Sequence, residues 1–115
     1  MSEKKESSSG ALPPAEAARL DKLLDYVPGS IVSRTLVKKD VGTVTLFAFD
    51  KGQALSEHSA PFDAMVQVLD GECELTIGGK PVRAVSGETV VMPANVPHAL
   101  QATSQFKMLL TMIRG

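Results

Sequence analysis

From Ile31 onward the chain is a series of short apolar runs that turn signals of Gly, Pro and Asp separate about every 8 to 12 residues. Side chains that alternate with a period of two and are rich in Val, Ile, Leu and Thr belong to strands that bury one face. The runs are IVSRTLV, VTLFAF, AMVQVL, CELTIG, TVVMP and KMLLTMI. Strands at this spacing predict an all-β domain, either an antiparallel sandwich or a barrel.

One pair of these strands carries its own turn signal. Cys73, Leu75 and Ile77 alternate with polar residues and are followed by Gly78-Gly79. Two glycines between strand-like segments are typical of a two-residue hairpin. We therefore expect a hairpin with one buried and one solvated face, in which Cys73 is an inert, buried small side chain.

The segment before the strands has a different period. Residues 14–26 read PAEAARLDKLLDY, with a proline at the start and Pro28-Gly29 after the end. This pattern predicts one short amphipathic helix that covers an edge or an open end of the sheet. Its apolar face would consist of Ala17, Leu20, Leu23 and Leu24.

Length and composition indicate a single domain. The chain has 115 residues, of which 43% are hydrophobic and 22% are charged. Residues 1–12 are mainly polar and small, so we expect a flexible tail there. The remaining residues, 13–115, then form one domain, with the barrel over about 31–114.

The charge and the apolar pattern argue against several classes of partner. A net charge of −1 and five aromatic residues (four Phe and one Tyr) provide neither a basic surface nor a stacking platform for nucleic acid. No apolar stretch reaches the roughly 20 residues of a membrane span. The single cysteine, Cys73, excludes an internal disulfide and suits a cytoplasmic location.

Two glycine-bounded stretches carry the only histidines of the chain, His58 and His98. These stretches are GQALSEHSAPFDAMVQVLDG, residues 52–71, and GETVVMPANVPHAL, residues 87–100. Their Gly, Pro and His spacing resembles the two motifs of the cupin superfamily, in particular its small single-domain conserved-barrel members. The resemblance implies a double-stranded β-helix, or jelly roll, and it covers most of the chain after the predicted helix.

The same resemblance implies a site inside the barrel. His58 and His98 match family positions whose imidazoles converge on a metal, whereas Ala60 and Ala64 stand where the family has a second His and a Glu. Stable divalent metal sites use three or more protein donors. We therefore expect His58 and His98 to bind a divalent transition metal (Fe, Mn, Ni or Zn) weakly, with water completing the shell.

Gln67 is the one candidate for a further donor or hydrogen-bond partner, because it is the strongly polar side chain inside AMVQVL. The alternation of side chains along the strand favours an orientation of Gln67 away from the cavity. If Ala64 faces the cavity, Val66 faces it too and Gln67 points away. A bulge after Pro61-Phe62 would reverse this assignment, so both orientations remain open.

The rest of the predicted pocket is apolar, and Glu57 and Asp63 are expected to face solvent. Loss of the two ligand side chains leaves space for a small apolar or aromatic molecule beside the histidines. The predicted lining consists of Ala60, Ala64, Val66, Met92 and Leu100, with Phe47 or Phe49, Met108, Leu110 and Met112 as further candidates.

Three functional interpretations follow. The first is a binding or sensing module that holds a metal ion weakly, a small molecule, or both at His58 and His98. The second is a metal-dependent enzyme of the oxygenase, isomerase or lyase type. The third is a structural barrel that is simply filled. The resemblance and the apolar run KMLLTMI also predict a homodimer.

Overall fold

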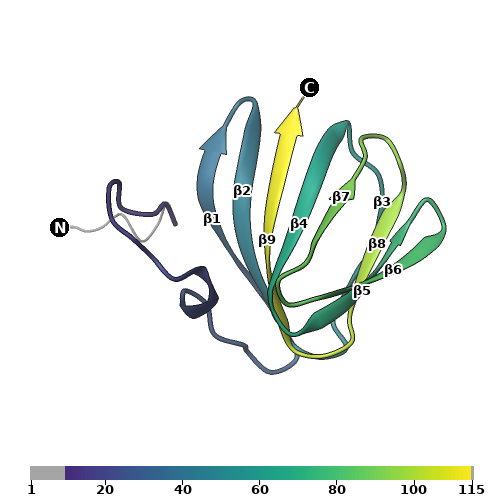
Figure 1. Ribbon diagram of the computed structural model, residues 1–115, viewed down its shortest axis with the longest axis horizontal. Helices are drawn as coiled ribbons and strands as arrows, with labels where there is room; N and C mark the ends of the chain where they lie inside the picture. The colour runs from purple at the N-terminus through teal and green to yellow at the C-terminus, as the bar shows by residue number, and fades with distance from the viewer. Residues whose placement is uncertain (1–9, 115) are drawn as a thin grey trace.

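The computed structural model describes residues 10–114, which fold into two antiparallel sheets that face each other (Figure 1). The larger sheet has the strand order β1-β2-β9-β4-β7 and the smaller one β3-β8-β5-β6. The nine strands are β1 (Ile31–Lys39), β2 (Gly42–Phe49), β3 (Ala54–His58), β4 (Phe62–Asp70), β5 (Glu72–Ile77), β6 (Lys80–Val85), β7 (Thr89–Met92), β8 (His98–Ala102) and β9 (Phe106–Arg114). The prediction of an all-β double-stranded β-helix is confirmed.

The alternating runs of the sequence all form strands, namely β1, β2, β4, β5, β7 and β9. The predicted hairpin joins β5 to β6 through Gly78 and Gly79, whose φ angles of 57° and 82° suit glycine. In β4 the alternation is strict: Ala64, Val66 and Val68 are buried, whereas the residues between them are only half-buried. The inner faces of both sheets therefore form one apolar core.

The two ends of the sandwich are packed differently, and the sheets converge at the end shown at the bottom of Figure 1. We call this the closed end. The rings of Phe49 and Phe106 stack there with centroids 4.6 Å apart, and both are fully buried. Cys73 lies in the same core as a free thiol, and its burial, with a smaller contribution from Glu72, raises its pKa to about 11.

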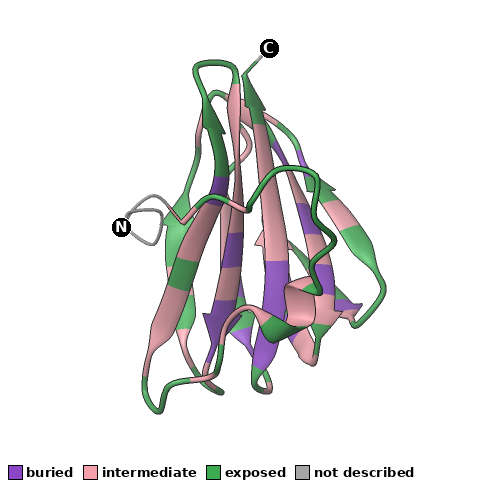
Figure 2. Ribbon diagram, turned by 90° about the vertical axis from the view of Figure 1, so that its left-hand side faces the viewer, coloured by how far each residue is buried: buried purple, intermediate pink, exposed green. Residues whose placement is uncertain are grey.

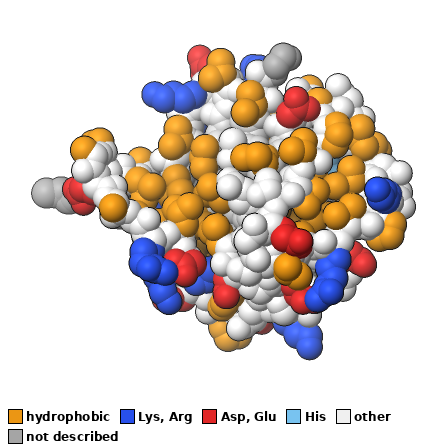
Figure 3. Space-filling view, in the orientation of Figure 1, with side chains coloured by type: hydrophobic (Ala, Val, Ile, Leu, Met, Phe, Trp, Pro, Cys, Tyr) orange, Lys and Arg blue, Asp and Glu red, His pale blue; other side chains and the backbone are white. Residues whose placement is uncertain are grey.

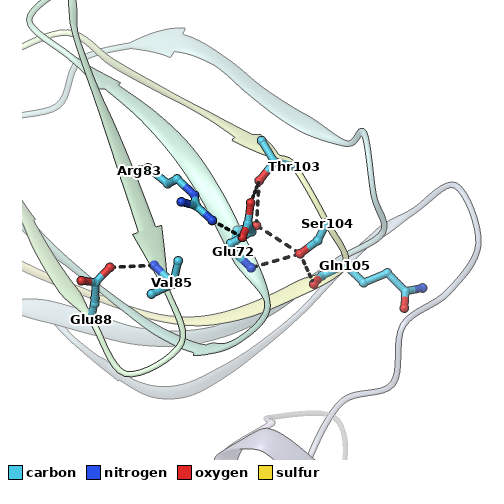
Figure 4. Close-up of polar contacts among 7 residues, drawn as sticks. All are labelled: Glu72, Arg83, Val85, Glu88, Thr103, Ser104 and Gln105. Carbon is cyan, nitrogen blue, oxygen red and sulfur yellow. Dashed lines mark hydrogen bonds and ion pairs between the residues drawn. The ribbon is translucent and has the colours of Figure 1, made fainter.

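A group of hydrogen bonds fastens the closed end from outside (Figure 4). We call Glu72, Arg83, Thr103 and Ser104 the polar latch. Arg83 Nη2 donates to Glu72 Oε1 at 2.7 Å, and Thr103 Oγ1 donates to Glu72 Oε2 at 3.2 Å. The Glu72 amide donates to Ser104 Oγ at 3.0 Å. The latch thus ties β5 to β6 and to the loop between β8 and β9.

The predicted helix over residues 14–26 was wrong. Only Leu20–Lys22 forms a single 3₁₀ turn, and the preceding residues 14–19 are exposed, with a turn at Pro14 and Ala15 followed by irregular backbone. Ala15 has a φ of 63°, which no right-handed helix accommodates, and a helix of this length is marginal without an apolar surface that buries its face. Of the tail predicted over residues 1–12, residues 1–9 lie outside the described part of the chain.

The segment of residues 20–26 instead lies against the outer face of the larger sheet (Figure 2). Lys107 Nζ donates to the backbone oxygen of Asp21 at 2.7 Å and lies 5.0 Å from the ring centroid of Tyr26. The Tyr26 hydroxyl donates to Asp70. Leu46 and Ala48 of this face are fully buried. Within residues 10–114, no helix is long and apolar enough to cross a membrane.

Candidate ligand site at the open end

His58 and His98 meet at the end of the sandwich opposite the stacked phenylalanines, which we call the open end. His58 is the last residue of β3 and His98 is the first of β8, and the two are directly paired across these strands. The register shifts between Leu55 and His58. This irregularity lets both Leu55 and His58 face the interior although they are three residues apart.

The loops beside the two histidines are tied to each other. Asn95 has a φ of 65°, and its N–H donates to the carbonyl oxygen of Ala60 at 2.8 Å. Asparagine tolerates this left-handed conformation better than most residues. The Asp63 carboxylate accepts a bond from the Ala94 N–H at 2.9 Å. Asp63 is exposed, as its position in the sequence suggested, but it also anchors the loop that delivers His98.

The two imidazoles face each other through their Nε2 atoms, which lie 3.2 Å apart. His58 Nδ1 is 2.9 Å from the oxygen of Ser56, and His98 Nδ1 is 3.2 Å from that of Val96. A carbonyl oxygen can only accept, so each Nδ1 carries a hydrogen. When both rings are neutral, each Nε2 atom presents a lone pair to the other, and this arrangement favours an occupant that accepts electron density from both.

The imidazoles open onto a cavity of about 60 Å³ between the sheets. Of the predicted site residues, Ala60, Ala64, Met92 and Leu100 line it together with His58 and His98. Val66 is fully buried but belongs to the core and does not line the cavity. The full lining is Leu55, His58, Ala60, Phe62, Ala64, Met92, His98, Ala99, Leu100, Met108, Leu110 and Met112.

Gln67 does not line the cavity. It lies on the same face of β4 as Met65 and Leu69, and all three are half-buried. The register of β4 with β7 and β9 is regular from Ala64 to Gln67, and it shifts only between Val68 and Asp70. The bulge that would have turned Gln67 inward is therefore absent from this part of β4.

Several lining residues could not be assigned from the sequence. Leu55 depends on the register shift in β3, which has no sequence signal here. Phe62 and Ala99 also line the cavity, although no pattern in the sequence marked them as lining residues. Phe47 and Phe49 were considered as lining residues but belong to the core beside the cavity instead.

Comparison with known proteins identifies the fold family. The model of the cupin domain matches residues 45–114. The chain belongs to the cupin family. A comparison with curated proteins found no match.

Solved cupin-like structures resemble most of the chain. A conserved protein of unknown function from Streptococcus pyogenes is 39% identical, with a TM-score of 0.87 over 90% of this chain and 91% of that one. A cupin 2 conserved barrel domain protein from Leptotrichia buccalis is 45% identical, with a TM-score of 0.78 over 81% of this chain and 45% of that one. A cupin superfamily protein from Desulfitobacterium hafniense is 26% identical, with a TM-score of 0.85 over 90% and 95%.

This cupin does not offer the donors of a hard-metal site. Across the described residues, no group of three or more His, Cys, Asp or Glu side chains could hold a metal ion. Ala60 and Ala64 do line the cavity, so methyl groups stand where the family motif has an imidazole and a carboxylate. An iron or manganese ion that needs oxygen donors from the protein does not fit here.

Proposed function

We propose that this cupin is a small binding protein that holds one metal ion weakly at His58 and His98. The supporting observation is the pair of Nε2 atoms, which lie 3.2 Å apart. In two neutral rings that carry their hydrogens on Nδ1, both Nε2 lone pairs point toward the space between them. Imidazole nitrogens bind zinc at about 2.0–2.1 Å, and a tetrahedral angle then separates two of them by about 3.3 Å. The separation of the two nitrogens is therefore close to that required by a shared ion.

Binding rather than catalysis is the better proposal for this site. A metal-dependent oxygenase, isomerase or lyase is the alternative, and it needs a group beside the ion that moves protons or orients a substrate. The described cavity lining is apolar apart from the two imidazoles. Because both imidazoles would hold the ion, no polar lining residue remains to move protons or orient a substrate. The chain itself thus supplies the ion with a partly enclosed, low-polarity pocket and two nitrogen donors.

The test is calorimetric titration of the metal-free protein with Zn²⁺. We expect one ion per chain with an affinity weaker than that of sites with three or four protein donors. The variant His58→Ala/His98→Ala should show no binding, whereas Glu57→Gln, which changes an exposed neighbour of His58, should bind like the original protein. Equal binding by the double alanine variant would place the ion elsewhere and refute the proposal.

A small organic molecule is the second candidate occupant, because ten of the twelve residues that line the cavity are apolar. The cavity volume of about 60 Å³ is well below the roughly 150 Å³ of a cavity that holds benzene. Only a compact molecule, or one end of a larger one, would fit. Thermal stabilisation by small alcohols or ketones in the presence of chelator supports this occupant, and stabilisation only by metal argues against it.

We further propose that the protein works in the cytoplasm. We also propose that two copies of the chain associate through the outer face of the larger sheet. Val91 and Ile113 are 59% and 58% exposed on this face. Figure 3 shows another side of the molecule, the one seen in Figure 1, where hydrophobic side chains lie on both sides of a strip of other atoms and most basic side chains lie near the margin. Sedimentation at micromolar concentration should give twice the 12.2 kDa chain mass, and a Val91→Lys/Ile113→Lys variant should sediment as a monomer.

A further inference from the structure

The cavity contains sulfur as well as nitrogen. Met92, Met108 and Met112 all line it, which places three of the five methionines of the chain around one small space. Met92 and Met108 are buried, and Met112 is half-buried. Methionine often fills irregular gaps in cores, and that role alone would not require it to gather beside two histidines.

Two of these methionines flank one position. Ala64 on β4 pairs with Met92 on β7 and with Met112 on β9. Side chains directly opposite each other on neighbouring strands have Cβ atoms about 4.5–5.5 Å apart. Thioethers therefore stand on both sides of the small alanine, which is the position where the cupin motif has its carboxylate.

The donor types in this cavity select a particular kind of ion. Thioether sulfur is a soft ligand that favours Cu(I), and imidazole also suits copper. No carboxylate lines the described cavity, so the charge of a bound ion would be balanced by no protein group there. The idealised cost of moving an ion into a low-dielectric site rises with the square of its charge, which favours a monovalent ion over a divalent one.

We propose that the cavity binds one cuprous ion through Nε2 of His58 and His98 and the sulfur of Met92, Met112 or both. This inference rests on the proposed function, because it uses the same two imidazoles. It replaces the weak two-nitrogen site with a set of three or four soft donors. It also makes Cu(I), the form of copper kept in reducing compartments, the preferred ion over Zn²⁺.

The experiment is an anaerobic competition between the metal-free protein and the coloured Cu(I) complex of bicinchoninate. The original protein should remove one Cu(I) per chain. The variant Met92→Leu/Met112→Leu keeps the side-chain volume and should lower the Cu(I) affinity by more than the ~10–100-fold typical of lost outer-shell contacts. Met65→Leu, on the opposite face of β4, is the matched control and should leave the affinity unchanged.

Zn²⁺ titration of the same variants separates the two proposals. Two outcomes overturn this inference and leave the proposed function standing. In both, the original protein binds Zn²⁺; either it fails to take Cu(I) from bicinchoninate, or Met92→Leu/Met112→Leu takes Cu(I) equally well. If His58→Ala/His98→Ala still binds both ions, both proposals are overturned. X-ray absorption of the copper-loaded original protein decides even if a variant fails to fold, since a nitrogen-only environment contradicts sulfur ligation.

Discussion

The two ends of the barrel differ in what occupies the space between the sheets. At the closed end, Phe49 and Phe106 are fully buried and stacked, and the polar latch fastens the strands outside them. At the open end, His58 is exposed, and the space behind it is a cavity rather than packed side chains. Stability and ligand binding are thus assigned to opposite ends of one core, so each should be changeable without the other.

The largest expected effect is a loss of stability at the closed end. Phe106→Ala removes a fully buried ring and should lower the free energy of unfolding by about 3–5 kcal/mol, as measured by urea denaturation. His58→Ala at the open end removes an exposed ring and should change it by no more than about 0.5 kcal/mol. Similar losses in the two variants would break the comparison.

The next effect concerns a turn at each end. Gly71 has a φ of 73°, and a Cβ atom there would lie 1.9 Å from the oxygen of Gln105. Gly71→Ala should therefore cost roughly 3 kcal/mol, the upper end of the usual range for backbone strain, because steric overlap adds to it. Gly79 has a φ of 82°, but a Cβ atom there would meet open space. Gly79→Ala should therefore lower the free energy of unfolding by only about 1 kcal/mol. Chemical denaturation of both variants tests this contrast.

The buried thiol sharpens the comparison at alkaline pH. Burial raises the pKa of Cys73 from its ordinary value of 9.0 to about 11. The folded protein then keeps its proton longer than the unfolded chain, so stability is intact below pH 9 and falls as pH rises toward 11, by about 2–3 kcal/mol in total.

Denaturation midpoints between pH 8 and 11 should show this decline, and Cys73→Ala should show a smaller slope over the same interval. Iodoacetamide should label Cys73 at pH 8 only after the protein is unfolded. Rapid labelling of the native protein would mean that the closed end opens far more readily than its packing indicates.

The smallest effect is expected at the polar latch, where the hydrogen bond between Arg83 and Glu72 is exposed to solvent. The hydrogen bond from Arg83 lowers the pKa of the Glu72 carboxyl. Its contribution to stability is therefore present above the ordinary pKa of 4.5 and is lost as pH falls through the lowered value in the folded state. Glu72→Gln should be slightly less stable than the original protein at pH 7 and indistinguishable from it at pH 2. A difference that persists at pH 2 would assign the effect to shape rather than charge.

Much of the fold could be predicted from the sequence because its determinants are local. Alternation along β4 favoured an inward orientation of Ala64 and Val66, and the Gly78-Gly79 pair predicted the hairpin. The helix over 14–26 was wrong because its amphipathic pattern did not reveal the backbone conformation at Ala15 or the sheet face that residues 20–26 would contact.

The candidate site was less accessible to prediction because it depends on register. The motif spacing indicated that His58 and His98 belong together, but their direct pairing follows from the irregular register of β3 with β8. The positions of Met92 and Met112 on both sides of Ala64 are set by the pairing of three strands distant in sequence. No local pattern contains that information.

The position of His58 at the rim has a kinetic consequence. His98 is half-buried, whereas His58 is exposed at the end of its strand. Rotation of an exposed side chain takes picoseconds to nanoseconds, so an occupant could exchange one donor for an incoming ligand without any opening of the barrel. The residence time of whatever binds here would then depend on which competing ligands reach the rim, and transfer to another molecule could proceed faster than release into water.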